Sequence, residues 1–273
     1  MSPEESRFAA ETAITPSGDG RWDARLSAAW TIADASNGGY ALSPVLRALR
    51  ELAGHPDPIS VTTHFLRPGL GDTAATVEAE PIRSGRRTGI ARGRLVQEGS
   101  VRLEVTAAFA ELVGAGDDEG SAPRIELPPP DVPPPEECVD RSELAQGVDL
   151  PILSRVEVRL RPDLAEPGAA GDAVMEGWIR FRDGAAPDTM SLPLFCDAFP
   201  PSLYPYVRDI GWVPTVELTV HPRRRPAPGW LRASLRCDDL SGGQMIESGA
   251  LWDSTGALVA RSRQLGLLLS QRS

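Results

Sequence analysis

The chain of 273 residues carries 28 basic and 38 acidic side chains, for a formal net charge of −10, and 41% of its residues are hydrophobic. This apolar content is typical of a globular protein with a substantial core, whereas the acidic balance argues against partners such as nucleic acid or an anionic membrane surface. All of the Lys+Arg residues are arginine. The missing lysine amine excludes Schiff-base chemistry and the lysine of a phosphate-binding loop.

The three cysteines, Cys138, Cys196 and Cys237, are widely spaced and form no CxxC pair. Neither a zinc site nor a disulfide framework is therefore indicated, and we expect no metal. The first residues lack the pattern of a signal peptide, and the apolar runs are too short to span a bilayer. These features favour a cytoplasmic protein.

The first half is predicted to contain one helix followed by four strands. Apolar residues at helical spacing indicate a helix over residues 40–53. Strand-like alternation follows over 59–67, 74–83, 88–97 and 101–112, with turn-forming residues between the strands.

A proline-rich, acidic segment over residues 114–148 separates this half from the next. Proline lacks the backbone donor that helices and sheets need, so we expect an extended linker that does not pair with strands. The predicted units are therefore residues 1–113, the linker 114–148 and residues 149–273.

The second half repeats the first at an offset of about 155 to 157 residues. Strands are predicted over 155–161, 174–182, 215–221, 230–237, 245–253 and 258–269, with a proline-interrupted helix near 190–208. A helix and four strands, occurring twice, predict an α+β protein of two units whose sheets each wrap one helix.

Several catalytic patterns are absent. The sequence has no GxSxG elbow and no HExxH motif, and the GxGxxA match at 69–74 precedes a predicted strand where a dinucleotide site needs a helix. His64 and His221 fall on predicted strands. A hydratase would need one of them beside an acid.

Motifs in both halves resemble the acyl-CoA thioesterase II (TesB-like) family. In the first half these are NGGY at 37–40, HFLRPG at 64–69, IRSGR at 82–86 and TAAF at 106–109. In the second half, three short anchors match the family's catalytic residues: Asp197 in LFCD, Thr215 in PTVE and Gln264 in VARSRQLG.

The resemblance implies a double hot-dog fold, in which two hot-dog units pair within one chain and place their central helices inside. It also implies a hydrolase of lipid metabolism whose substrate is an acyl-CoA or acyl-carrier-protein thioester. The family uses no metal or organic cofactor. Asp197, Thr215 and Gln264 would hold and activate a water, with one active site per chain, in the second half.

That set of residues suits the chemistry. A carboxylate can accept a proton from the attacking water, while a threonine hydroxyl and a glutamine amide can fix its direction. Backbone amides at a helix start can stabilise the oxyanion, so Gly38, Gly39 and Tyr40 are the candidate oxyanion and substrate-binding residues.

Two other functions remain open, together with further expectations. The chain could be a non-catalytic double hot-dog protein that binds acyl thioesters or acts as a scaffold, or it could be an enoyl-thioester hydratase.

We expect a homodimer or a higher homo-oligomer. Phe195 and Trp212 are candidates for the acyl pocket, and the arginines at 86–87 and 223–225 are candidates for contacts with the phosphates of coenzyme A.

Overall fold

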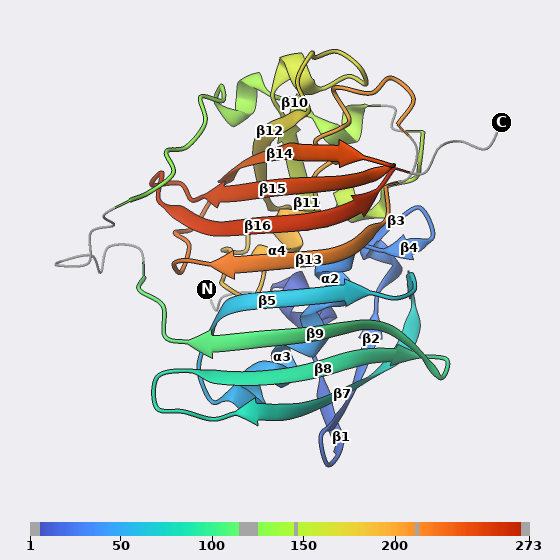
Figure 1. The fold of residues 1–273 in the computed structure, drawn as a ribbon, viewed down its shortest axis with the longest axis vertical. Helices are drawn as coiled ribbons and strands as arrows, with labels where there is room; N and C mark the ends of the chain where they lie inside the picture. The colour runs from blue at the N-terminus through green and yellow to red at the C-terminus, as the bar shows by residue number, and fades with distance from the viewer. Residues whose placement is uncertain (1–5, 115–124, 145–146, 211–212, 269–273) are drawn as a thin grey trace.

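A computed structural model describes residues 6–114, 125–144, 147–210 and 213–268. Its main feature is one thirteen-stranded sheet in the order β1-β2-β7-β8-β9-β5-β13-β16-β15-β14-β12-β11-β10, in which each neighbouring pair is antiparallel. The first half supplies one side of this sheet and the second half the other (Figure 1).

The elements of the first half are α1 (Arg7–Glu11), β1 (Thr15–Gly18), β2 (Arg21–Leu26), η1 (Ala28–Trp30), α2 (Gly38–Ala41), α3 (Ser43–Ala53), β5 (Asp57–Phe65), β7 (Thr73–Arg83), β8 (Gly89–Gln97) and β9 (Ser100–Ala110). A small separate sheet contains β3 (Thr31–Ile32), β4 (Ala35–Ser36) and β6 (Gly69–Leu70).

The rest of the chain contributes η2 (Pro135–Glu137), β10 (Val139–Asp140), η3 (Arg141–Glu143), η4 (Pro151–Ser154), β11 (Val156–Leu160), η5 (Pro162–Leu164), β12 (Val174–Phe181), α4 (Leu192–Asp197), β13 (Thr215–Pro222), β14 (Leu231–Ser241), β15 (Gln244–Trp252) and β16 (Leu258–Leu267). Helices α2, α3 and α4 all lie behind the sheet in Figure 1.

The two halves meet where β5 pairs antiparallel with β13. Thr62 and Thr219 face each other at this junction, and their hydroxyl oxygens lie 3.0 Å apart. At the start of β5, the buried Asp57 carboxylate accepts hydrogen bonds from Arg225 at 2.7 Å and from Thr189 at 2.9 Å. At this junction the halves are therefore joined by backbone pairing and by a buried polar cluster.

Helix α3 packs its apolar face against the sheet of the first half. Val45, Leu46 and Leu49 are fully buried at helical spacing, and the helix contacts β7, β8 and β9. Pro44 lies in the first turn, where its missing N–H costs nothing, and Gly54 ends the helix in the left-handed conformation. The helix predicted over 40–53 is confirmed, divided into α2 and α3.

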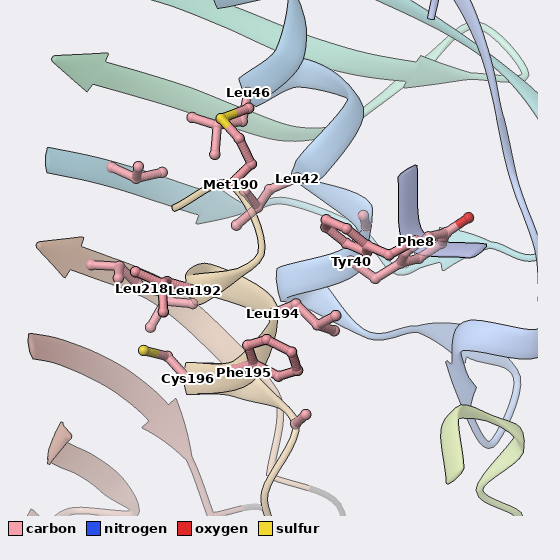
Figure 2. Packing of buried hydrophobic residues seen from close by; sticks show 14 of the residues in the cluster. Phe8, Tyr40, Leu42, Leu46, Met190, Leu192, Leu194, Phe195, Cys196 and Leu218 are labelled. Atoms are coloured by element: carbon pink, nitrogen blue, oxygen red, sulfur yellow. The ribbon is translucent and has the colours of Figure 1, made fainter. Parts of the chain in front are cut away.

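A close contact between α2 and α4 forms the centre of the molecule. A Cβ atom on Gly39 would lie 2.5 Å from the Pro193 carbonyl oxygen and 2.6 Å from Leu194 Cα, so only glycine allows this approach. Figure 2 shows Leu194 and Phe195 of α4 in the same interior as Tyr40 and Leu42, and all four residues belong to one apolar core. This contact brings Gly38 and Gly39 of the first half against helix α4 of the second half.

The ten predicted strands are all present, with bounds that differ by a few residues at most. The helix near 190–208 is shorter than predicted. Only Leu192–Asp197 is helical, because the prolines that follow turn the chain.

The prediction of a linker that pairs with no strand is wrong at residues 139–140. Val139–Asp140 forms the edge strand β10 against β11. The proline-rich stretch before it also packs on the second half: the indoles of Trp178 and Trp252 donate to the carbonyls of Pro133 and Leu127, each at 2.8 Å. An extended polyproline backbone leaves its carbonyls free to accept such bonds. Residues 115–124 and 145–146 of the predicted linker lie outside the described residues.

Candidate active site

Thr215 reaches the helix-facing side of the sheet through a β-bulge. Strand β13 pairs Thr215 with Gly266 and Glu217 with Leu265, so Val216 is the extra residue. Without the bulge, Thr215 would alternate onto the opposite face from Leu218, which is buried. The bulge instead places the Thr215 hydroxyl beside Gln264 of β16.

Gln264 and Thr215 form a direct pair. Gln264 Nε2 donates to Thr215 Oγ1 at 2.9 Å. Only 9% of Gln264 is exposed, and Thr215 is half-buried. Because the threonine oxygen accepts this bond, its own hydroxyl hydrogen is available to a further acceptor. The structure thus brings together two of the three residues expected to hold a water.

Asp197, the last residue of α4, is held by the first half of the chain. Asn37 Nδ2 donates to Asp197 Oδ2 at 2.8 Å and to the Asp197 backbone oxygen at 3.0 Å. The Gly39 amide donates to the same Oδ2 at 2.9 Å. Asn37 also caps α2, because its Oδ1 accepts from the Tyr40 amide. The carboxylate therefore depends on both halves for its position.

The environment of Asp197 changes its acidity. Burial raises its pKa to about 7 from an ordinary value of 3.8; the amide of Gly39 opposes this shift, and the charge of Glu247 adds to it. A carboxyl group with a pKa near neutrality is suited to general-base catalysis, since it is ionised at working pH and still basic enough to take a proton.

No hydrogen bond joins Asp197 directly to Thr215 or Gln264 within the described part of the chain. Asp197 is related to the Thr215–Gln264 pair through the packing of α4 on the inner face of the sheet. Helix α4 packs against β13 and β15, and Glu247 of β15 stands directly opposite Gln264 of β16. Glu247, Gln264 and Thr215 thus lie together on the face of the sheet against which α4 packs, and the charge of Glu247 acts on Asp197 of that helix.

The structure differs from the expectation at the start of α2. The Gly39 amide already donates to Asp197, and the Gly38 amide also lowers the pKa of that carboxyl group. These amides therefore do not face an empty site. Tyr40 is fully buried and stacks on Trp30, with ring centroids 4.9 Å apart. Its hydroxyl donates a hydrogen bond to the Glu11 carbonyl oxygen. Its side chain is part of the core.

Sequence reasoning missed two residues of this site, Asn37 and Glu247. Asn37 precedes a glycine pair and is a typical helix cap, so its position at a helix start was readable. Its contact with Asp197 spans the two halves and has no local signal. Glu247 lies in an alternating strand at an inward position, where a carboxylate among apolar neighbours is a signal that could have been noticed.

Both histidines considered for a hydratase lie away from this site. His64 and His221 are exposed, while their strand neighbours Thr63 and Val220 are buried. Because side chains alternate along a strand, both histidines occupy the outer face of the sheet. Within the described ranges, no group of three or more His, Cys, Asp or Glu residues could hold a metal ion.

The other candidate pocket and phosphate residues have mixed outcomes. Phe195 is fully buried and packs against Phe181, with ring centroids 4.7 Å apart. Arg225 binds Asp57, so it serves the junction between the halves. Trp212 lies outside the described residues.

Comparison with known proteins identifies the family. Models of the acyl-CoA thioesterase N-terminal and C-terminal domains match residues 26–110 and 130–268, respectively. The chain belongs to the acyl-CoA thioesterase family. The resemblance seen in the sequence motifs is thereby confirmed. This acyl-CoA thioesterase family member has no helix, within the residues described, that is long and apolar enough to cross a membrane.

Similar proteins cover almost the whole chain. A putative thioesterase II from Thermobifida fusca is 32% identical, with a TM-score of 0.87 over 98% of this chain and 99% of that one. A hot-dog protein of unknown function from Alicyclobacillus acidocaldarius is 24% identical, with a TM-score of 0.84 over 97% and 98%. An uncharacterized protein of Mycobacterium tuberculosis is 28% identical over 92% of this chain and 91% of its own length. The chain thus has a hot-dog fold.

Proposed function

We propose that this family member hydrolyses an acyl thioester, with coenzyme A or an acyl-carrier protein as the thiol. The observations that support this proposal are the Asp197 carboxylate held between the two halves and the Thr215–Gln264 pair, whose Thr215 lies on β13, a strand against which α4 packs. The thioesterase domains matched over both halves support the same reaction.

The proposed mechanism uses Asp197 as the general base. Asn37 and Gly39 both donate to Oδ2, and we assign Oδ1 to the water. Thr215 and Gln264 orient that water. As its oxygen attacks the thioester carbonyl carbon, Asp197 takes one proton. The carbon–sulfur bond then breaks, and the thiolate receives the proton, so a carboxylic acid and a free thiol leave.

The fold and assembly complete the proposal. Two hot-dog units in one chain form a double hot-dog, since two helix-bearing halves share one continuous sheet. The pseudo-dimer has edge strands β1 and β10, which a second copy could cover, so we propose a homodimer or a higher homo-oligomer. Light scattering at micromolar concentration should give at least twice 29.2 kDa; a species of monomer mass would contradict this. A cytoplasmic setting and a role in lipid metabolism belong to the same proposal.

A panel of acyl-CoA thioesters of different chain length tests the reaction, with release of the free thiol followed directly. We expect turnover that depends on chain length and is abolished neither by a chelator nor by dialysis. Binding of an acyl-CoA without thiol release would instead favour an acyl-thioester-binding protein. Hydration of an enoyl-CoA without hydrolysis would favour a hydratase.

A further inference from the structure

A second carboxyl group, that of Glu247, lies in the interior beside the proposed active site. Only 4% of the residue is exposed, and it stands on the inner face of β15 directly opposite Gln264. Its Oε2 accepts a hydrogen bond from the Ser202 amide at 2.6 Å. The mechanism above gives this group no role.

Within the described residues, no positively charged side chain forms an ion pair with Glu247. No ion pair to Glu247 or Asp197 is found among the residues that the structure describes, although a buried charge is normally paired. The inward neighbours along β15, Met245 and Gly249, are buried and carry no polar side chain. A neutral glutamine could accept the Ser202 bond equally well. The bond alone therefore does not explain a carboxylate at this position.

Other charged and titratable groups near the two carboxyl groups come from several elements. These groups are Cys196 at the end of α4, Cys237 and Asp238 of β14, Ser262 and Gln264 of β16, the Ser202 amide, Asn37 with the Gly38 and Gly39 amides of α2, and Arg141 of η3, whose Nη1 donates to the Ala198 carbonyl. The charged groups that act on Glu247 and on Asp197 are acidic.

We propose that Glu247 is a positioning residue for hydrolysis, whose negative charge keeps the Asp197 carboxylate basic enough to take a proton from water. Two nearby carboxyl groups repel each other when both are ionised. An ionised Glu247 therefore raises the affinity of Asp197 for its proton. Burial raises the pKa of Glu247, and the hydrogen bond from the Ser202 amide opposes this shift because it stabilises the anion. This inference rests on the proposed function, because it assigns Asp197 as the base.

The direct test replaces the charge and keeps the shape. Glu247→Gln retains an oxygen acceptor for the Ser202 amide. The Asp197 carboxyl carbon is titrated by ¹³C NMR in the wild type and the variant, and kcat is measured against pH on the best acyl-CoA substrate. Glu104→Gln, on the exposed face of β9, is the matched control that removes one surface charge.

We expect Glu247→Gln to lower the Asp197 midpoint and the acid limb of kcat by about one pH unit. The plateau kcat should fall by no more than about tenfold, because a weaker base transfers the proton less readily, while KM stays unchanged. Glu104→Gln should move neither midpoint. Glu247→Asp, which keeps the charge, should hold the acid limb close to its wild-type position.

Two results would overturn the inference. One is an unchanged Asp197 midpoint in folded Glu247→Gln. The other is a loss of kcat at every pH as large as that of Asp197→Asn, which would make Glu247 the base itself. If Glu247→Gln does not fold, the wild-type NMR titration decides: an Asp197 curve without a second, coupled step contradicts the proposal. This NMR result stands even if no thioester is hydrolysed, so failure of the proposed function is recognised separately.

Discussion

At the scale of single residues, the central fact is that Asp197 belongs structurally to both halves. Its backbone comes from α4, while two of its hydrogen-bond donors come from the α2 region. These donors fix the carboxylate, and its buried setting raises its pKa to about 7. The same shift therefore has consequences for activity and for stability.

The pH dependence of activity follows from this pKa. Asp197 must be ionised to accept a proton, so kcat should rise with pH through about 7 and then level off. Steady-state thiol release between pH 5 and pH 9 would measure this limb, with a buffer-only blank at each pH. A limb that ends well below pH 5 would contradict the assignment.

The stability prediction has the opposite sign. The folded-state pKa of Asp197 exceeds its unfolded value of 3.8, so the stability linked to its bound proton is fully present below 3.8 and is lost as pH rises through about 7. Asp197→Asn does not titrate. Thermal unfolding should show the variant gaining stability relative to the wild type between pH 4 and pH 8. A difference in Tm that is constant with pH would refute this linkage.

At the scale of elements, the α2–α4 contact positions the site. Gly39→Ala would place a methyl group against the backbone of Pro193 and Leu194. We expect a loss of about 1–3 kcal/mol in unfolding free energy, together with displacement of the amide that donates to Asp197. Urea denaturation measures the loss.

Gly171→Ala is the matched control for this prediction. A Cβ atom at Gly171 would meet no atom within 4 Å, so the variant should unfold like the wild type. Equal stability of Gly39→Ala and Gly171→Ala would show that the helices can separate without cost.

The elements themselves were largely predictable from sequence, because alternation and turn residues act locally. Strands β5 and β7–β9 follow the predicted ranges closely, and the alternation also places Gln264 on a buried face. The bulge at Val216 and the contact of Asn37 with Asp197 were not predictable. The bulge shifts register by one residue without a glycine to mark it, and the contact joins residues 160 positions apart.

The packing of the linker was likewise not predictable from its own sequence. Its proline content predicts extended backbone, but the tryptophan donors that bind its carbonyls lie far away in sequence. Composition describes what a segment can do alone, whereas the second half supplies the partners that it packs against.

At the scale of the whole molecule, the junction between the halves should control stability. Asp57→Ala leaves Arg225 and Thr189 without their shared acceptor, so we expect a loss of about 2–4 kcal/mol in unfolding free energy. The Arg92–Glu80 pair provides the control: its side chains are 65% and 60% exposed, and Glu80→Ala should cost no more than about 0.5 kcal/mol. Equal losses in urea denaturation would show that the Asp57 cluster does not stabilise the junction.

The role of Asp197 as general base is tested most directly by the turnover of Asp197→Asn against the wild type on the best acyl-CoA substrate, with folding checked by circular dichroism. The substitution keeps the shape of the side chain and removes its ability to accept a proton. We predict a fall in kcat of roughly 10²–10⁴ in a folded protein. Near-normal turnover in folded Asp197→Asn would contradict the account, because another group would then activate the water.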